Sequence, residues 1–308
     1  MAEIDTLVDD VKDVLKNVIQ GDSHEIDEGT LGDFGESVSK AIQRALTARS
    51  EPRPPKTLYM SEIGKPCVRQ IWYNLRHEEY GEVKEDLLPH AKIKFMYGDI
   101  LEELLLFFAR QAGHEVAMEQ ESFKKELPNG WVVKGRIDAV IDGILVDVKS
   151  ASSYAFKKFK ENRVPEDDPF GYMKQLEYYA RGMVEKYGAL PTKNFPVAFL
   201  AIDKTTGNIV LDRYTIDIAK DPTEWEQELV DKLEGERPPA RPFNEVPMGK
   251  SGNHKLPVEC SYCPWKWECW SDANEGDGLR AFAYSSGPVF MTYVAKEPNV
   301  PEITQEAE

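Results

Sequence analysis

Hydrophobic residues recur at helical spacing in three parts of the chain. Apolar side chains three or four positions apart share one face of a helix. They follow this pattern over residues 4–19, 31–46 and 92–112. We therefore predict a helical extension over residues 1–50 and a longer helix over 92–112 that precedes the first strands of the main sheet.

Alternating and β-branched segments follow this third helix. Strand-like runs lie at 115–124, 131–141, 144–149, 196–203 and 208–217, and further helical patterns lie at 152–161, 170–187 and 221–235. Strands that alternate with helices are typical of α/β proteins, in which helices cover the faces of a sheet. The pattern predicts an α/β fold with a mixed central sheet flanked by helices.

One hairpin gives the strongest local signal. Asp142-Gly143 separates two β-branched runs, and this dipeptide favours a two-residue type I′ turn because both positions need a positive φ. Counting outward from that turn places Asp138 opposite Asp147. Directly opposed side chains have Cβ atoms about 4.5–5.5 Å apart. Lys149, two residues beyond Asp147, lies on the same face of the strand.

Two carboxylates held opposite each other are destabilising unless a cation lies between them. Carboxylate oxygens favour Mg²⁺ or Mn²⁺, and such an ion beside Lys149 suits phosphodiester hydrolysis. Four cations downstream could hold neighbouring phosphates: Lys157, Lys158, Lys160 and Arg163. The alternative is a polar, solvent-exposed face on which Lys149 and Arg136 neutralise the two acids.

The charge of the chain is unevenly distributed. The 308 residues carry a formal net charge of −16, which by itself argues against a nucleic-acid partner. Residues 1–50 hold 11 acids against 5 bases, and residues 271–308 hold 7 acids against 2 bases. Most of the acidity thus lies in the two ends, and the central region is compatible with DNA binding. We expect 271–308 to form an acidic, partly flexible tail.

Membrane and targeting signals are not evident in the sequence. No run approaches the ~20 apolar residues of a membrane span. The first residues are acidic and amphipathic, unlike a secretory signal. With 41% hydrophobic residues, the chain can bury a sizeable core. We expect a soluble, cytoplasmic protein with no membrane partner.

The chain has four cysteines, namely Cys67, Cys260, Cys263 and Cys269. Four cysteines in a long chain of this kind favour metal or cluster ligation over disulfides. Structural zinc sites usually combine two short-spaced pairs, whereas a [4Fe–4S] cluster needs four thiolates. A cluster, a zinc ion and unligated core cysteines all stay open on spacing alone. The tryptophans within 265–270 either stack on single-stranded bases or pack around this site.

The acids and the lysine of the hairpin resemble the core motif of the PD-(D/E)XK nucleases. That motif is an Asp, about ten residues, and then an acid-x-Lys on a strand, which here reads Asp138 and Asp147-Val148-Lys149. The resemblance implies a restriction-endonuclease-like fold. It also implies metal ligation by the two acids and the Val148 carbonyl, and a lysine that assists the attacking water.

Two further elements are similar to the RecB-like branch of that superfamily. Gln175 and Tyr179 match its QxxxY motif, which implies that they position the DNA backbone or the catalytic lysine. The branch also carries a Gly-x-x-x-His on the helix before the sheet, with the histidine as a metal ligand. The corresponding residue here is Glu102, and Glu103 or Asp99 could be that ligand instead.

The cysteines extend the resemblance over residues 58–270. One cysteine before the nuclease core and three after it are characteristic of the iron–sulfur RecB-like nucleases, which include CRISPR-associated and AddB-type exonucleases. The resemblance therefore implies a nuclease domain over 58–270. It would be closed by a structural [4Fe–4S] cluster on the four cysteines named above.

These observations predict a Mg²⁺- or Mn²⁺-dependent DNA nuclease, with exonuclease action on a DNA end favoured over endonuclease action. The expected setting is DNA recombination, repair or phage DNA metabolism. Since the chain shows no helicase motif, unwinding would require a helicase or recombination protein as partner. Three alternatives stay open. One is a CRISPR-associated nuclease that trims DNA for spacer acquisition, and another is a catalytically silent, cluster-bearing DNA-binding or scaffold subunit. The third is a zinc-stabilised binding module with no cluster.

Overall fold

The computed structural model describes residues 3–26, 28–47, 53–81, 84–86, 89–188 and 190–303. Positions 1, 2, 27 and 48–50 of the predicted N-terminal extension, and 304–308 of the predicted tail, lie outside the described residues. The chain divides into two compact units, Met1–Lys65 with Leu88–Val230 and Pro66–Leu87 with Asp231–Glu308. None of the described helices is long and apolar enough to cross a membrane.

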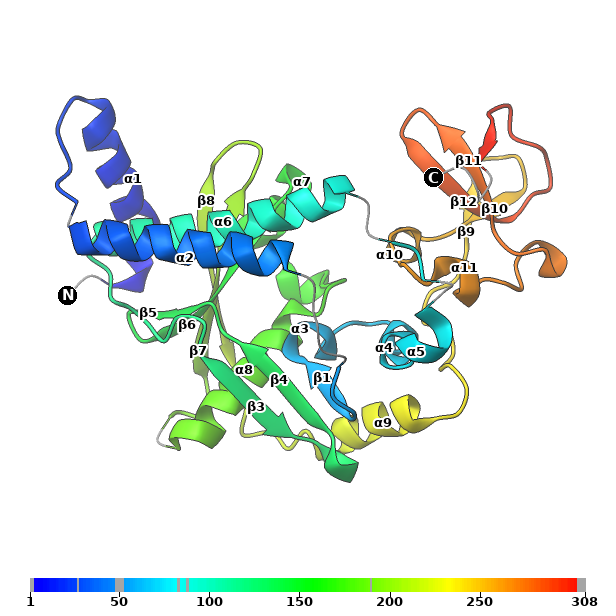
Figure 1. Ribbon diagram of the computed structural model, residues 1–308, viewed down its shortest axis with the longest axis horizontal. Coiled ribbons are helices and arrows are strands. Elements are labelled where there is room, and N and C mark those ends of the chain that lie inside the picture. Colours follow the sequence, from blue (N-terminus) through cyan, green and yellow to red (C-terminus); the bar gives the residue numbers. More distant parts are fainter. Residues whose placement is uncertain are drawn as a thin grey trace. The chain divides into compact units, whose positions relative to one another are not determined.

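A five-stranded sheet in the order β2-β5-β6-β7-β8 forms the centre of the first unit (Figure 1). Its strands are β2 (Val116–Ala117), β5 (Ala139–Ile141), β6 (Ile144–Ala151), β7 (Phe195–Asp203) and β8 (Ile209–Ile216). β6 and β7 pair in parallel, and the other neighbouring strands are antiparallel. A parallel pair needs a crossover, here supplied by α7 (Ser153–Lys160) and α8 (Tyr172–Tyr187). The predicted mixed α/β sheet with flanking helices is confirmed.

A three-stranded sheet in the order β1-β4-β3 belongs to the same unit. Its elements are β1 (Thr57–Tyr59), the short helix α3 (Met60–Ile63), β3 (Ser122–Glu126) and β4 (Val132–Arg136). Two glycines allow close packing on this sheet. A Cβ on Gly135 would lie 2.7 Å from the Met60 Cβ, and one on Gly182 of α8 would lie 2.8 Å from the Phe123 Cβ. The lack of a side chain at both positions therefore lets α3 and α8 lie against the strands.

The N-terminal helices contribute to the core of the first unit. They are α1 (Leu7–Ile19), α2 (Glu28–Leu46) and α6 (Pro89–Gln111). α1 and α6 pack on the five-stranded sheet, and α2 runs beside α6 (Figure 1). Leu7 and Val11 of α1 are buried in one cluster with Leu105 and Leu106 of α6. The apolar side of α1 and α6, which the sequence pattern predicts, therefore faces this sheet.

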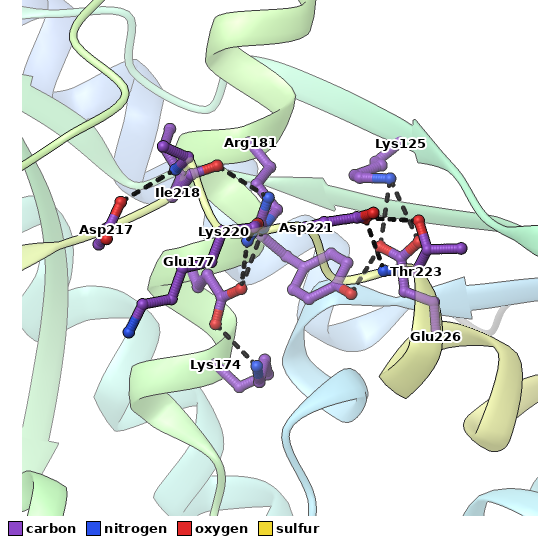
Figure 2. A network of polar contacts seen from close by, with 12 residues as sticks. Lys125, Lys174, Glu177, Arg181, Asp217, Ile218, Lys220, Asp221, Thr223 and Glu226 are labelled. Carbon is purple, nitrogen blue, oxygen red and sulfur yellow. Dashed lines mark hydrogen bonds and ion pairs between the residues drawn. The ribbon is translucent and has the colours of Figure 1, made fainter.

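A network of polar contacts fixes α8 against the chain that enters α9 (Thr223–Glu234) (Figure 2). Arg181 donates to the carbonyl oxygens of Ile218 at 3.1 Å and of Lys220 at 2.9 Å. The Tyr178 hydroxyl donates to Glu226 at 2.8 Å. These contacts hold α8 in one rotational setting, which matters because the same helix carries the QxxxY residues Gln175 and Tyr179.

The second unit has its own antiparallel sheet, in the order β13-β11-β12-β10-β9. Its strands are β9 (Val246–Met248), β10 (Asn253–Lys255), β11 (Arg280–Tyr284), β12 (Gly287–Tyr293) and β13 (Glu302–Ile303). Its helices are α4 (Val68–Leu75), α5 (His77–Tyr80), α10 (Val258–Ser261) and α11 (Lys266–Cys269).

The segment 271–308 differs from the partly flexible tail that we expected. Its described part contributes β11, β12 and β13 to this sheet. Ala281, Phe282 and Met291 in these strands are at most 2% exposed. The strands are short and separated by polar turns, so the alternation of apolar and polar residues along them is weak in the sequence. Their pairing with one another and with β10 makes them part of a sheet.

His114 links α1 to the hairpin turn between β5 and β6. Its side chain is fully buried. Its Nδ1 atom lies 2.6 Å from Oδ2 of Asp142, and its Nε2 atom lies 3.2 Å from Oδ2 of Asp10 on α1. Asp142 also accepts the backbone N–H of Glu115 at 3.0 Å. The imidazole thus bridges two carboxylates that come from distant parts of the sequence.

Replacing His114 with alanine should destabilise the first unit. The substitution leaves Asp142, whose side chain is only 11% exposed, without its imidazole partner and breaks the contact to Asp10. Loss of a partner from a buried charged group costs about 2–3 kcal/mol. Urea unfolding followed by circular dichroism measures the change, with the exposed His90→Ala as matched control. Equal free energies of unfolding for the two variants would contradict this role.

Candidate active site

The turn between β5 and β6 has the geometry that its dipeptide predicts. Asp142 has a φ of 49° and Gly143 a φ of 80°, the positive values that a type I′ turn needs. The strands pair in the register counted from that turn. Asp138, which directly precedes β5, and Asp147 on β6 are therefore the next opposed positions.

The hairpin brings two acids and a lysine together. The backbone N–H of Val148 donates to Oδ2 of Asp138 at 2.6 Å. Nζ of Lys149 forms an ion pair with Oδ2 of Asp147. Only 2% of the Asp147 side chain and 17% of the Lys149 side chain are exposed. Nζ of Lys149 also lies 4.6 Å from the ring centroid of Tyr172, the first residue of α8.

Burial raises the pKa of both acids, and the charge of Asp147 adds to the rise for Asp138. Burial first, and then the charge of Asp147, raises the pKa of Asp138 to about 7, against the opposing charge of Lys149. The pKa of Asp147 is raised by burial and lowered by Lys149. Burial disfavours the Lys149 ammonium, yet the charges of Asp147 and Asp138 outweigh burial and raise the pKa of this lysine. The lysine stays charged, and further positive charge beside the acids would stabilise both.

Glu102 on α6 is electrostatically part of the same site. Its pKa is raised to about 9, by burial first and then by charges that include those of Asp138 and Asp147. The side chain of Gln120 donates to Oε1 of Glu102 at 2.7 Å. A third carboxyl group from a separate helix therefore joins the pair from the hairpin.

The other two acids that the sequence offered on this helix have different surroundings. Glu103 is 6% exposed and has an oxygen 3.9 Å from the Arg44 guanidinium of α2. Burial raises the pKa of Asp99, while nearby cations including Arg44 lower it. Of Asp99 and Glu102, only Glu102 has a pKa that is raised by the charges of both Asp138 and Asp147.

Gln175 and Tyr179 lie on one face of α8 beside the acids. Nε2 of Gln175 donates to the Tyr179 hydroxyl at 2.9 Å. The two residues are 8% and 5% exposed. Burial, followed by the charges of Asp147 and Asp138, raises the pKa of Tyr179. The pair is thus hydrogen-bonded, buried and adjacent to the hairpin acids.

Comparison with known proteins identifies the family. The family model described as the PD-(D/E)XK nuclease superfamily matches residues 15–270. The chain belongs to the PD-(D/E)XK nuclease superfamily. It is similar to the crystal structure of SSO0001, with 17% identity and a TM-score of 0.40, over 75% of this chain and 92% of that chain. No curated protein matches it. Membership of this nuclease superfamily implies a nucleic-acid substrate and a divalent metal, which these enzymes typically use.

The acids of this superfamily member have the donor chemistry of a divalent-metal site. Mg²⁺ and Mn²⁺ prefer oxygen ligands, and repulsion between Asp138, Asp147 and Glu102 raises the pKa of Glu102 and Asp138. In the described part of the chain, no group of three or more His, Cys, Asp or Glu side chains is placed to hold a metal ion. Lys149 is the cation that pairs with Asp147. The carboxylate oxygens are therefore of the type that binds the metal this superfamily uses. In this structure, however, the Asp147 side chain is positioned to pair with the Lys149 ammonium.

Tyr172 is a residue of this site that sequence reasoning missed. Its ring lies against the Lys149 ammonium. Burial raises the pKa of its hydroxyl, and the charge of Lys149 lowers it. Tyr172 precedes Gln175 by three positions, so the two share a helix face. That spacing was the only signal in the sequence.

The cations that we expected to hold DNA phosphates lie on α7 and just after it. Lys157 and Lys160 are exposed. Lys158 and Arg163 instead form ion pairs with acidic side chains of the same region. Two of these four cations are therefore available without breaking an ion pair.

The four cysteines of this nuclease all belong to the second unit and are free thiols. Burial, followed by the charges of Cys269 and Cys67, raises the pKa of Cys260 to about 12. Burial and the charges of the other three cysteines raise the pKa of Cys263 to about 12 as well. Cys67 and Cys269 thus act on both Cys260 and Cys263, while no three of these side chains in the described residues are centred on a single ion.

Two of the three tryptophans beside the cysteines, Trp265 and Trp270, are packing residues, whereas Trp267 is half-buried. Trp265 is 0% exposed, stacks on Tyr73 with ring centroids 5.4 Å apart, and donates to Oδ1 of Asn74 at 2.8 Å. Trp270 is 5% exposed and has the guanidinium of Arg241 4.3 Å from its ring centroid. Both rings are enclosed within the second unit, which leaves no open face for a nucleic-acid base.

Glu102→Gln should make the stability of the metal-free protein less dependent on pH. A carboxyl with a pKa of about 9 in the folded chain, against an ordinary value of 4.5, binds its proton more tightly in the folded state. Its contribution to the free energy of unfolding is complete below pH 4.5 and is lost as the pH rises towards 9. The slope is at most about 1.4 kcal/mol per pH unit.

Guanidinium unfolding in EDTA at a series of pH values between these two limits measures the slope. The exposed Glu126→Gln serves as matched control, because it removes the same charge from the same unit. A slope that is identical in wild type and Glu102→Gln would show that this carboxyl is not held in its protonated form.

Proposed function

We propose that the protein is a metal-dependent deoxyribonuclease that removes nucleotides from DNA ends by hydrolysing phosphodiester bonds. The observation that carries the proposal is the opposed pair of the half-buried Asp138 and the buried Asp147, with Lys149 beside it, in a member of a nuclease superfamily. Opposed carboxylates in a buried hairpin reduce stability, so a chemical role is the reason to retain them. Its setting would be DNA recombination, repair or phage DNA metabolism, with a helicase or recombination protein as partner.

Asp138, Asp147 and Glu102, together with the backbone carbonyl of Val148, would hold Mg²⁺ or Mn²⁺. Their oxygen atoms are the ligands that these ions prefer. When bound, the ion supplies polarisation of a phosphoryl oxygen and a more acidic attacking water. Repulsion among the acids, which raises the pKa of Glu102 and Asp138, supports this assignment because a divalent cation would relieve it.

Lys149 would orient the attacking water and stabilise the negative charge that develops on the phosphate. The charges of Asp147 and Asp138 keep its ammonium protonated, and the Tyr172 ring confines it. A cation that is already fixed in position needs no reorganisation when charge develops in the transition state.

Substrate contacts would come from α7 and α8. Gln175 and Tyr179, hydrogen-bonded to each other beside the acids, would hold the DNA backbone or the lysine. Lys157 and Lys160 are exposed on α7 and would contact neighbouring phosphates. Phosphate contacts of this kind position the strand without reading its sequence.

Asp147→Asn and Lys149→Met should each lower the rate of DNA degradation about 100-fold or more, because each removes a group that acts on the reacting phosphate. Digestion of end-labelled single- and double-stranded DNA with Mg²⁺ or Mn²⁺ measures the rate. Lys193→Met, an exposed lysine of the same unit, is the matched control. Degradation at the wild-type rate by both site variants would refute the assignment.

Circular single-stranded DNA separates the two modes of cleavage in the same assay. An exonuclease requires an end, so linear oligonucleotides should disappear while the circle stays intact. Cleavage of the circle at a comparable rate would contradict the exonuclease assignment and leave the nuclease assignment in place.

We also propose that the four cysteines hold a structural [4Fe–4S] cluster. They lie in one unit and are free, and the charges of Cys67 and Cys269 add to the rise that burial causes in the pKa of both Cys260 and Cys263. A [4Fe–4S] cluster needs four thiolates and tolerates wide spacing between them in the sequence. The cluster would join Cys67 to residues 260–269, the two segments that build this unit.

Anaerobically purified protein should contain about four irons per chain and absorb visible light as a cluster does. Cys263→Ala should lose the iron and lower the unfolding midpoint by roughly 5 °C or more, because ligand loss removes folding free energy. Ser261→Ala, two residues away, is the control. Stoichiometric zinc in place of iron would overturn the cluster and support a zinc-stabilised unit.

A further inference from the structure

A basic groove lies in the first unit between the three-stranded sheet and α8. It encloses about 780 Å³, within the range of typical ligand sites. Four cations line it: Lys124, Lys134, Arg136 and Lys186. Glu185 is the one acid among its described lining residues. Such a concentration of positive charge stands out in a chain with a net charge of −16.

Two lysines of this groove are held against each other. Lys124 on β3 is directly opposed to Lys134 on β4, and Arg136 faces Ser122 one pair further along the same face. Both lysines are exposed, and neither is in an ion pair within the part of the chain that the structure describes. Opposed like charges are destabilising. A bound anion would reverse that effect.

An aromatic side chain lies on the same face as the two lysines. Tyr59 of β1 is half-buried, lines the groove and is paired with Lys134, so its side chain points to the face that carries both lysines. Cations beside an aromatic ring suit a strand with unpaired bases, since a duplex would present only its phosphates.

The groove is connected to the carboxylate pair through β4. Arg136 is the last residue of β4 and precedes Asp138 by two positions. Its charge opposes the rise in the pKa of Asp138 that burial and Asp147 cause. At ~3.3 Å per strand residue, Lys134 lies about 13 Å along the chain from Asp138. That length spans a few nucleotides.

We propose that this groove is a second nucleic-acid subsite, which holds an unpaired DNA strand a few nucleotides from the bond to be cut. Lys124 and Lys134 bind phosphates of that strand, Arg136 binds the phosphate nearest the carboxylate pair, and the Tyr59 ring contacts bases. The inference rests on the proposed nuclease function and adds a binding site outside the hairpin and α7.

The test compares two double variants of the full chain. Lys124→Ala/Lys134→Ala removes the opposed pair, and the control Lys193→Ala/Lys204→Ala removes two exposed lysines elsewhere in the same unit. Binding of a fluorescein-labelled oligothymidylate of about 20 nucleotides, longer than one typical single-strand site, is followed by anisotropy in EDTA over a salt series. We expect the groove variant to bind about tenfold more weakly. Its slope of log affinity against log salt should be smaller by about 1.4, because each phosphate contact contributes about 0.7.

Three results would overturn the proposal. They are unchanged affinity of the groove variant, an equal loss of affinity in the control, and an equal loss for a blunt duplex of the same length. Lys124→Arg/Lys134→Arg retains both charges and should restore binding, and failure to do so would also overturn it. The alanine variant should unfold no earlier than wild type because it removes opposed like charges. A folding defect is thus recognisable.

Hydrolysis of bis(4-nitrophenyl) phosphate with Mn²⁺ separates this inference from the nuclease proposal. That diester is too small to reach from Asp138 to Lys134, so the groove variant should lose about tenfold more kcat/KM for DNA than for the diester. Equal losses for both substrates would overturn the groove. If wild type hydrolyses neither substrate while the groove variant still loses DNA binding, the nuclease proposal fails and the groove stands.

Discussion

The repulsion between two opposed carboxylates is the constraint on which the candidate active site depends. A type I′ turn forces Asp138 and Asp147 into opposed positions, and water has little access to the buried Asp147 and only partial access to the half-buried Asp138. The chain offsets this cost with one backbone N–H and one ammonium, those of Val148 and Lys149. Glu102 then adds a third acid to the same field. Each added acid raises the energy of the metal-free protein and strengthens the attraction for a cation.

The fold brings these groups together through close approaches that a side chain would prevent. A Cβ on Gly98 of α6 would lie 3.1 Å from Oγ of Ser150, so this glycine lets the helix that carries Glu102 approach β6. The parallel pairing of β6 and β7 requires a crossover, and that crossover places Tyr172, Gln175 and Tyr179 beside the hairpin. The contacts of Arg181 then hold α8 in register with the site (Figure 2).

The net charge of this chain does not describe the charge of its individual regions. Residues 1–50 and 271–308 carry net charges of −6 and −5, whereas cations line the groove of the three-stranded sheet. A net charge of −16 therefore coexists with a local surface that suits a polyanion. In the second unit, the four cysteines and the enclosed Trp265 and Trp270 come from segments far apart in sequence.

The sequence by itself determined the hairpin, its register and the amphipathic helices. These features depend on local rules, namely the positive φ of the turn at Asp142, the alternation of a strand and the period of a helix. Tertiary structure alone decided that Tyr172 covers Lys149 and that His114 bridges two acids. It also decided that Lys124 faces Lys134 and that 280–303 forms a sheet. Each of these depends on which distant segments pair, and that choice is made by the burial of the whole core, which no local pattern encodes.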